Sequence, residues 1–334
     1  MRGVIRLAAI LSSAALALAA CGGAATPSAT PGGATSSYPT KTIDIMAPAS
    51  PGGGFDTTAR LVQRGLTEGK VVSVNVTVAN KPGAGGTTGM AELIKNSKGD
   101  PYATILIGRV TLGSQITLKT DAKLSQLTPI ARLMAESEVI VTPASSPFKT
   151  IGDLMDALKK DAKAVKFAGG SAGGIDHELA GRLIKEAGGD VKDLSYVPYA
   201  GGGEAAAAII GNQHQVGISG YGEFKGHIDG GQMKALAVSS DEPLTGVNIP
   251  TLKKSGVNIA LTNWRMWAAP PDISAADLAK LKELAKKVHD SAIWKDFATK
   301  NNWFDNFTTD GLTTFIGTET SSLTAALTDL GLVK

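Results

Sequence analysis

Glycine-rich loops follow strand-like segments at five places in the chain, and four of these loops precede helix-like segments; this alternation restricts the fold more than any other feature. The first run, 52–54, follows an alternating segment, 42–46, that predicts a strand, and precedes 57–66, whose apolar spacing predicts a helix. Because glycine has no Cβ, the backbone there can turn sharply and approach a ligand closely. Backbone N–H groups and the positive end of the helix dipole would then point at one spot. The loop therefore predicts an anion site without Lys or Arg; an ordinary strand-to-helix turn is the alternative.

The same order recurs along the chain. Four further strands, each followed by a glycine-rich loop, are predicted over 74–79, 165–168, 195–198 and 216–219. Helices are predicted after three of these loops, over 175–186, over 204–210 and in a short segment ending at Asp229. Alternating strands and helices indicate parallel α/β sheets, in which ligands bind outside the carboxyl ends of the strands.

Several of these loops also carry motifs of a known family. The motifs are 51–56 with Ala59 and Arg60, Asn80 with 82–86, Gly173 with His177, and 197–199 followed by 201–203. In their order and spacing they resemble the substrate-binding proteins of tripartite tricarboxylate transporters, the Bug or TctC-like family. Two later segments, 236–238 and 250–252, fit the same pattern. The resemblance extends from about Tyr38 to the C-terminus.

The resemblance implies an α/β, periplasmic-binding-protein-like fold with two lobes, each a sheet flanked by helices, hinged by two crossing strands. It implies a solute-binding protein that is not an enzyme and that captures a di- or tricarboxylate or a related organic acid between the lobes. It also implies delivery of that ligand to two integral-membrane subunits of a transporter. We expect a monomer with no cofactor, no metal site and no nucleic-acid partner.

We expect the loops of both lobes to line the ligand cleft. From the first lobe these are Ser50, Pro51, Gly52, Gly53, Gly54, Phe55 and Asp56. From the second lobe they are Ser171, Ala172, Gly173, Gly174, His177, Tyr199, Gly201, Gly202 and Gly203. Backbone N–H groups would hold the carboxylates. The loop 80–86 either lines the cleft or only shapes the first lobe.

Two of these side chains have alternative roles. His177 faces the ligand in the interpretation that the resemblance favours, and in the alternative it only hydrogen-bonds its own loop. Asp56 lies near a predicted helix start, where a carboxylate is most often a cap, and this is the role we expect. Binding a ligand amine or ordering the glycine loop are the other possibilities.

The N-terminus predicts export and lipid attachment. Residues 1–20 combine Arg2 and Arg6 with an apolar run that ends in small residues, which is typical of a signal peptide. A permanent membrane helix needs ~20 apolar residues, so the run is too short for one; a buried helix is the alternative. Residues 18–21 resemble a bacterial lipobox, in which the cysteine is lipidated. Cys21 is the only cysteine, so it cannot form an internal disulfide, and we expect it to carry lipid.

The segment 21–38 predicts a flexible tether between the lipid and the folded body, because it is rich in Gly, Ala, Ser, Thr and Pro and lacks charge. The protein is therefore expected to be exported and lipid-anchored on the extracytoplasmic side of a cell membrane. Without residues 1–20 the count of basic residues falls from 33 to 31 while the acidic count stays at 30. A nearly neutral body without a dense Lys/Arg run gives no support to nucleic-acid binding.

The body is long enough for two lobes. We predict that residues 39–140 and 262–334 form the first lobe and 141–261 the second. The chain would cross between them at 139–142 and return at 263–267. A helix is predicted to open at Thr150, because Asp153 stands three residues after it and apolar residues follow at helical spacing.

One enzymatic alternative is a serine hydrolase. Gly169–Gly173 matches the G-x-S-x-G nucleophile elbow, with Ser171 as the nucleophile and His214, His227 or His289 as its base. The sequence lacks an HGGG-type oxyanion motif upstream, and no acid stands out as the orienting residue, so a binding protein is favoured. A dinucleotide site is weaker still, because Thr88 occupies the position of the third glycine in 83–89. The single Cys and four His show no metal-ligand spacing.

Overall fold

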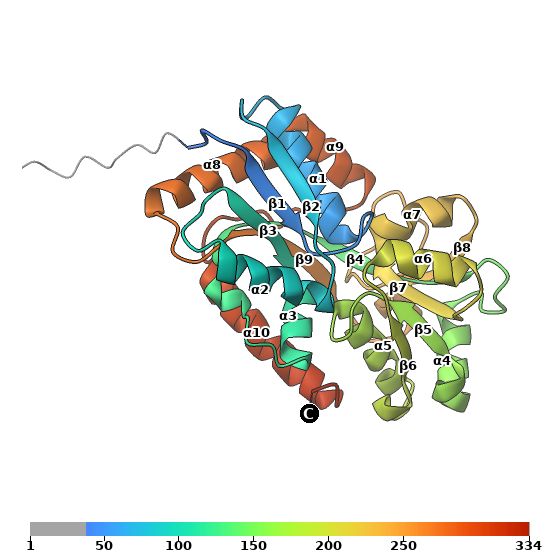
Figure 1. Cartoon of the computed structure of the whole chain (residues 1–334). Helices are drawn as coiled ribbons and strands as arrows, with labels where there is room; N and C mark the ends of the chain where they lie inside the picture. Colours follow the sequence, from blue (N-terminus) through green and yellow to red (C-terminus); the bar gives the residue numbers. More distant parts are fainter. Residues whose placement is uncertain (1–37, 334) are drawn as a thin grey trace, which may run out of the picture. The chain divides into compact units, whose positions relative to one another are not determined.

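The strands form one mixed sheet in the order β2-β1-β3-β9-β4-β7-β5-β6, with β8 also paired to β4 (Figure 1). The structure is a computed structural model that describes residues 38–333. The strands are β1 (Ile43–Ala47), β2 (Val76–Asn80), β3 (Ala103–Gly108), β4 (Thr128–Pro143), β5 (Lys166–Gly169), β6 (Ser195–Pro198), β7 (Val216–Gly220), β8 (Met233–Val238) and β9 (Thr262–Ala269). The predicted export signal 1–20, Cys21 and nearly all of the tether 21–38 lie outside the described residues.

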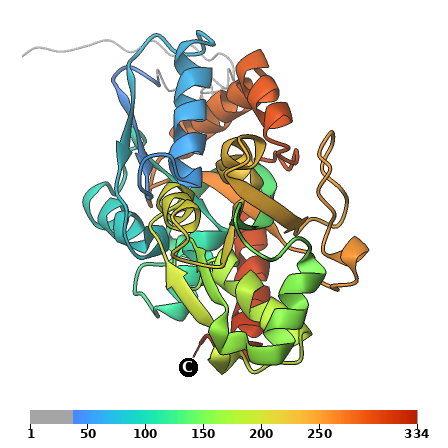
Figure 2. The same ribbon diagram turned by 90° about the vertical axis from the view of Figure 1, so that its right-hand side faces the viewer.

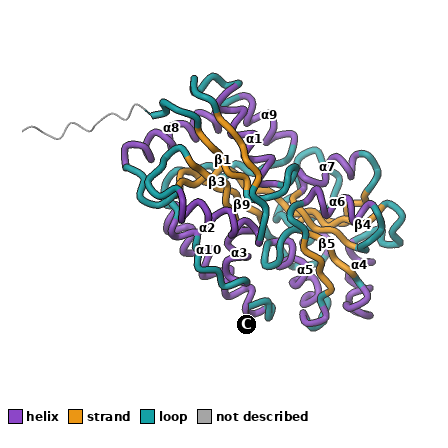
Figure 3. Tube along the Cα trace, viewed as in Figure 1, coloured by secondary structure: helices purple, strands orange, loops and turns teal. Residues whose placement is uncertain are grey.

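Helices follow most of the strands, as the alternation in the sequence predicts. They are α1 (Gly54–Thr67), α2 (Thr87–Asn96), α3 (Arg109–Thr117), α4 (Ile151–Asp161), α5 (Ile175–Glu186), α6 (Gly202–Ile210), α7 (Tyr221–Asp229), α8 (Ala275–Asp290), α9 (Ala292–Lys300) and α10 (Leu312–Asp329). Figure 3 shows the strands enclosed between these helices. Between residues 38 and 333 no helix has the length and apolar character needed to cross a membrane.

The long strand β4 belongs to two groups of strands. Its segment 128–137 pairs with β9, and its segment 138–143 pairs with β7 and β8. We call β2, β1, β3, β9 and the first segment of β4 the first half-sheet, and the remaining strands with the second segment of β4 the second half-sheet. Strand β4 thus carries the chain from one half-sheet to the other, and β9 begins after the return. The predicted lobe boundaries, 39–140 with 262–334 and 141–261, stay a prediction.

The alternating strands pair parallel within each half-sheet, as predicted, whereas the strands at the junction pair antiparallel. Within the half-sheets β1 is parallel to β2 and β3, and β5 is parallel to β6 and β7. The two strands that connect the half-sheets run the other way: β9 is antiparallel to β3 and β4, and β4 is antiparallel to β7 and β8. Parallel neighbours in a sheet are usually joined by a helical crossover. Here β4 itself carries the chain from one half-sheet to the other, so it can pair antiparallel with its neighbours.

Apolar side chains on both faces of each half-sheet form the cores. Helices α1, α8 and α9 pack on one face of the first half-sheet, and α2, α3 and α10 on the other (Figures 1 and 2). Helices α4 and α5 cover one face of the second half-sheet and α6 and α7 the other. Trp267 of β9 and Phe167 of β5 are completely buried in these layers. The glycine loops are therefore held between rigid strands and helices.

Local sequence signals fix several element ends. Thr150 caps α4, since its hydroxyl accepts a hydrogen bond from the Asp153 N–H, and the Asp153 carboxylate accepts one from the Thr150 N–H. Helix α5 has the predicted bounds, and β6 matches its predicted strand. Helix α1 begins at Gly54, three residues before its predicted start, because the third glycine already adopts helical geometry.

Candidate functional site

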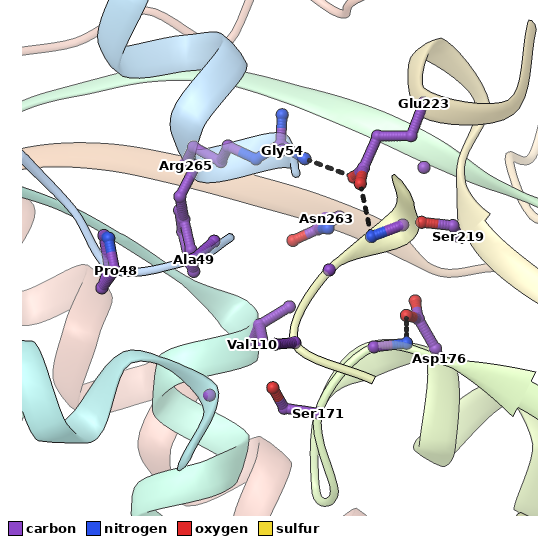
Figure 4. A pocket seen from close by; sticks show the side chains of 17 residues that line it. Pro48, Ala49, Gly54, Val110, Ser171, Asp176, Ser219, Glu223, Asn263 and Arg265 are labelled. Carbon is purple, nitrogen blue, oxygen red and sulfur yellow. Dashed lines mark hydrogen bonds and ion pairs between the residues drawn. The ribbon is translucent and has the colours of Figure 1, made fainter. Parts of the chain in front are cut away.

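The carboxyl ends of the strands surround a cavity of about 50 Å³ (Figure 4). Five helices present their first turns to it: α1 through Gly54, α3 through Val110, α5 through Asp176, α6 through Gly202 and α7 through Glu223. The backbone N–H groups of a first helical turn have no partner within the helix, and the dipole makes that end positive. The convergence of five such ends favours negative charge in or beside the cavity.

Glycine is required at two helix starts that line the cavity. A Cβ atom at Gly54 would lie 1.9 Å from Nη2 of Arg265, and one at Gly202 would lie 2.3 Å from Oε2 of Glu223. Both distances are far below van der Waals contact, so only a residue without a side chain lets these charged groups reach the helix starts.

Contacts between the two half-sheets close the cavity. The Ser50 N–H donates to the Ala200 carbonyl at 3.3 Å, and the Ser50 hydroxyl donates to the Glu204 carboxylate at 2.7 Å. On the other side, the Ser114 hydroxyl donates to the Ala172 carbonyl at 3.0 Å. These hydrogen bonds join the loop before α1 to the loop before α6, and α3 to the loop before α5.

A buried arginine lies at the centre of the site. The Arg265 guanidinium, 3% exposed, forms ion pairs with Glu136 and, at 3.4 Å, with Glu223. It also donates to the Thr58 hydroxyl at 3.2 Å. Figure 4 shows Arg265 beside Gly54 with its ion pair to Glu223. The charge of Arg265 is therefore already shared between two carboxylates of the protein.

The wall opposite α1 is acidic. We define the acidic wall as Glu136 and Glu138 of β4, Asp176 of α5 and Glu223 of α7. Asp176 accepts a hydrogen bond from the Gly170 N–H at 2.6 Å, and Glu223 accepts one from the Gly202 N–H at 3.1 Å. Glu138 is completely buried, and neither of its carboxyl oxygens has a hydrogen-bond donor among residues 38–333.

Burial weakens ionisation along this wall. It raises the pKa of Asp176 to about 6 and the pKa of Glu223 to about 7, and neighbouring carboxylates add to the rise. Burial and the nearby Asp176 carboxylate hold the pKa of Glu138 well above its usual range. The described residues contain no cluster of three or more His, Cys, Asp or Glu arranged to hold a metal ion.

Comparison with known proteins places the chain in a family. The sequence profile of the "Tripartite tricarboxylate transporter family receptor", TctC, matches residues 58–331. The chain belongs to this family. A UPF0065 protein of Agrobacterium vitis, from the TAR-I ttuE-ttuC' intergenic region, is 30% identical over 257 residues, which are 76% of this chain and 72% of that protein. The resemblance of the sequence motifs to TctC-like proteins is thereby confirmed.

Solved structures of similar proteins show the same fold. The periplasmic binding protein BugD superposes with a TM-score of 0.81 at 20% identity, over 89% of this chain and 100% of BugD. MatC from Rhodopseudomonas palustris, solved with bound malate, superposes with a TM-score of 0.78 at 20% identity, over 87% of this chain and 100% of MatC. The fold of this TctC-family chain is therefore the predicted α/β periplasmic-binding-protein fold, in a family of binding proteins rather than enzymes.

Five of the predicted site residues line the cavity of this TctC-family chain: Gly54, Phe55, Ser171, Gly201 and Gly202. The others lie around it without lining it: Ser50, Pro51, Gly52, Gly53, Asp56, Ala172, Gly173, Gly174, His177, Tyr199 and Gly203. Of the loop 80–86, Gly85 lines the cavity. Each predicted loop thus lies against the cavity by one or two of its predicted residues, and their role in ligand binding stays a prediction.

His177 and Asp56 both order their own loops. The Gly173 N–H donates to Nδ1 of His177 at 3.0 Å, and the imidazole stacks on Tyr196. Burial lowers the pKa of His177 to about 4, so the ring is neutral and can accept this bond. Asp56 accepts from the Gly52 N–H at 2.9 Å and pairs with Arg60. Helix α1 has Gly53 at its N-cap and no side-chain cap, so the expected capping role of Asp56 is wrong.

The geometry gives Ser171 no catalytic partner within the described part of the chain. The three candidate bases are bonded elsewhere: His214 to the Tyr199 hydroxyl, His227 to Gln232, and His289 to Asp290 and Asp305. A serine nucleophile needs a base within hydrogen-bond distance that a third group orients. The described residues do not form such an arrangement.

The sequence reasoning missed five polar and charged residues of the cavity lining. Asp176, Ser219, Glu223, Asn263 and Arg265 all face the cavity. Arg109, the first residue of α3, does not line the cavity and is held by Glu178 at 2.9 Å and Glu319 at 3.0 Å. The sequence could have indicated Asp176 and Glu223 as site residues, because each stands in the first helical turn after a glycine loop. No local sequence pattern indicates Arg265 as a site residue.

Proposed function

We propose that this chain is an extracytoplasmic solute-binding protein that captures a small organic acid in the cavity and delivers it to the two membrane subunits of a tripartite tricarboxylate-type transporter. The observation that carries the proposal is the convergence of five helix N-termini on one cavity in a chain of the TctC family. Helix starts favour a carboxylate through their N–H groups and the helix dipole, without needing a lysine or arginine. The malate bound to MatC supports this class of ligand.

Ligand entry requires the half-sheets to separate. A cavity of about 50 Å³ has room for a few waters, since one water needs ~10–15 Å³ of such volume. We therefore propose that residues 39–140 with 262–334 and residues 141–261 move as two lobes about β4 and the segment before β9. In this proposal the hydrogen bonds of Ser50 and Ser114 break when the cleft opens and re-form over the ligand.

A ligand screen tests the binding function. Full-length protein is heated with di- and tricarboxylates, aromatic acids and acidic amino acids, and hits are measured by isothermal titration calorimetry. We expect at least one acid to raise the melting temperature and to bind with one-to-one stoichiometry, and the methyl ester of its carboxylate to bind far more weakly. Labelling of Ser171 by a fluorophosphonate probe, with turnover of an ester, would instead support a hydrolase.

Lipid anchoring is tested separately. We propose that Cys21 carries the lipid and that the tether 21–38 connects it to the body. We expect Cys21→Ala to release the protein from the membrane fraction and to leave its melting temperature unchanged. Wild type and variant are compared by immunoblotting of carbonate-washed membranes. Equal retention of the two proteins on the membrane would show that Cys21 is not the anchor.

A further inference from the structure

The acidic wall has more carboxyl groups than the described residues supply with cations and hydrogen-bond donors. It contains four carboxyl groups, and Arg265 is the one cation that the described residues pair with them. Nη2 of Arg265 forms its closer ion pair with Glu136 and lies 3.4 Å from Oε1 of Glu223. Burying a carboxylate without a full set of donors is costly, and each ionised carboxylate offers about four acceptor sites.

Hydrogen-bond donors are equally scarce. The bonds to the acidic wall that face the cavity come from the Gly170 and Gly202 N–H groups. The Tyr196 hydroxyl, which is also buried beside Asp176, donates to the Gly170 carbonyl instead. Glu138, 0% exposed, has no donor for either oxygen. A completely buried carboxyl group without a donor shows that the acidic wall has too few donors and too little positive charge of its own.

The cavity reaches two of the four carboxyl groups directly. Asp176 and Glu223 line it, and Ser219 and Asn263 add further polar atoms on the same side. Figure 4 shows Asp176 and Glu223 on the second half-sheet side, across the cavity from Pro48 and Ala49. A bound group at this wall would contact two carboxylates, each of which is already fixed by a backbone N–H. Such preorganised acceptors suit a compact cation with several N–H donors.

We propose that the ligand of this chain carries a protonated amine, which Asp176 and Glu223 bind at the acidic wall. The inference rests on the proposed function, because it concerns the ligand of the same cavity. The helix starts on the α1 and α3 side remain available for a carboxylate, so the ligand is a small zwitterion. A second carboxylate directed at the acidic wall would meet the carboxyl groups of Asp176 and Glu223 and would be repelled by their ionised forms.

The acidic wall responds to the cation by releasing protons. Asp176 and Glu223 face Glu136 and Glu138 of β4, Tyr196 of β6 and Arg265 of β9. Burial raises the pKa of Glu223 to about 7, so this carboxyl is only partly ionised at neutral pH. An ammonium group favours the ionised form, and its binding near neutral pH expels part of a proton to the buffer.

The test uses sets of acids that differ in one group. Succinate, malate and aspartate form one set, and glutarate, hydroxyglutarate and glutamate form a second. Adipate and aminoadipate extend the series, and putrescine supplies a diamine without a carboxylate. Each compound is titrated calorimetrically into full-length protein. We expect an amine-bearing acid to bind at least ~10-fold tighter than its hydroxyl and unsubstituted counterparts, the gain typical of a charge-assisted hydrogen bond.

Variants of the two lining carboxylates test whether the acidic wall causes the preference for an amine-bearing acid. Glu223→Gln and Asp176→Asn keep the acceptor for the backbone N–H, and each should reduce the preference for the amine to about 3-fold or less. Glu186→Gln removes an exposed carboxylate from the far end of α5 and serves as the matched control, with an unchanged preference. If the Glu223 and Asp176 variants fail to fold, wild-type protein is titrated in buffers of different ionisation enthalpy. We expect these titrations to detect proton release when an amine-bearing acid binds, and none when its hydroxyl or unsubstituted counterpart binds.

Each outcome is decisive. Tighter binding of the amine with proton release supports the inference. Equal or tighter binding of the unsubstituted or hydroxy acid overturns the inference and leaves the proposed function standing. Binding of putrescine alone supports the acidic wall and overturns the capture of carboxylates. Binding of none of these compounds, with no hit in the wider acid screen, overturns both proposals.

Discussion

Individual side chains at the cavity are held by charge and by close approach to backbone. Arg265 lies against Gly54, where a Cβ atom would be 1.9 Å from its Nη2 atom. Its ion pairs with Glu136 and Glu223 hold β9, β4 and α7 together at the cavity. Removing one partner of such a buried pair is costly because the other charge stays buried without compensation.

The Gly54→Ala substitution tests this packing. The added methyl group displaces the Arg265 guanidinium from its carboxylate partners, so we expect a loss of about 2–4 kcal/mol in the free energy of unfolding. Gly317→Ala is the matched control, because it lies inside α10 with nothing within 4 Å of its Cβ position. It should stabilise the protein by about 0.4–1 kcal/mol. Urea unfolding measures both, and equal stability of the two variants would contradict the role of Gly54.

The pH dependence of stability tests the environment of Glu223. Its pKa is raised from 4.5 to about 7 in the folded protein by burial. The folded state therefore binds more protons than the unfolded state between these values. As a result, the contribution of Glu223 to the free energy of unfolding falls as pH rises from about 4.5 to about 7. Glu223→Gln should show a smaller decline across this window. His177 titrates in both proteins and cancels from the comparison, and Glu186→Gln should behave like wild type.

Loops and helices position the site through contacts between the two half-sheets. The loop before α1 meets the loop before α6, where a Cβ at Gly53 would lie 3.2 Å from the Ser50 carbonyl oxygen and 3.5 Å from the Cα atom of Gly201. Asp56, Arg60 and Asn80 fix the first of these loops from behind. The cavity is therefore closed by backbone meeting backbone.

Gly53→Val tests the closure. The branched valine side chain fits the extended backbone at this position, so we expect the melting temperature to stay near that of wild type. The same side chain fills the space between the two loops, so we expect ligand affinity to fall at least ~100-fold. Gly203→Ala is the control, since the nearest atom to its Cβ position is the Pro51 carbonyl oxygen at 3.8 Å. Calorimetry with the best acid of the screen measures both variants. Normal binding by Gly53→Val would show that these loops need not meet.

The sequence predicted the elements better than the site, for a physical reason. Strand–loop–helix order depends on neighbours in the chain, so α5 and β6 could be located directly. The acidic wall depends on pairing between distant segments: Glu138 of β4 lies opposite Gly220 of β7, and Arg265 of β9 opposite Met134 of β4. No local pattern encodes such a register. His177 illustrates the same limit, because its position after a glycine loop suits a ligand contact and a loop contact equally.

The molecule as a whole is joined at β4 and β9, with further bonds between the half-sheets. Arg109 of α3 pairs with Glu178 of α5 at 2.9 Å and with Glu319 of α10 at 3.0 Å. Trp264 of β9 donates to the same Glu319 carboxylate at 2.7 Å. An opening movement that separates α3 from α5 therefore also changes the surroundings of Trp264.

Tryptophan fluorescence follows this movement. We expect ligand to shift the emission of wild type, and Trp264→Phe to lose most of the shift, because Trp264 stands between Asn263 and Arg265 of the cavity lining. Trp267→Phe should keep the shift, since Trp267 is completely buried in the core. Trp303 is the other candidate, because its ring centroid lies 5.9 Å from the Arg265 guanidinium carbon. A shift that survives Trp264→Phe and disappears in Trp303→Phe would place the movement on the α9 side of Arg265.

The pairing of β9 with β3 and β4 also dictates the order in which the protein can fold. Strand β9 lies between these two strands in the sheet but is synthesised long after both. Until it arrives, the first half-sheet has two open strand edges, which readily pair with other chains. Residues 138–261 contain every strand of the second half-sheet, so that part can assemble first, while the first must wait for long-range contacts that form slowly. A chain whose last 70 or so residues are still being synthesised or translocated therefore cannot complete its first half-sheet.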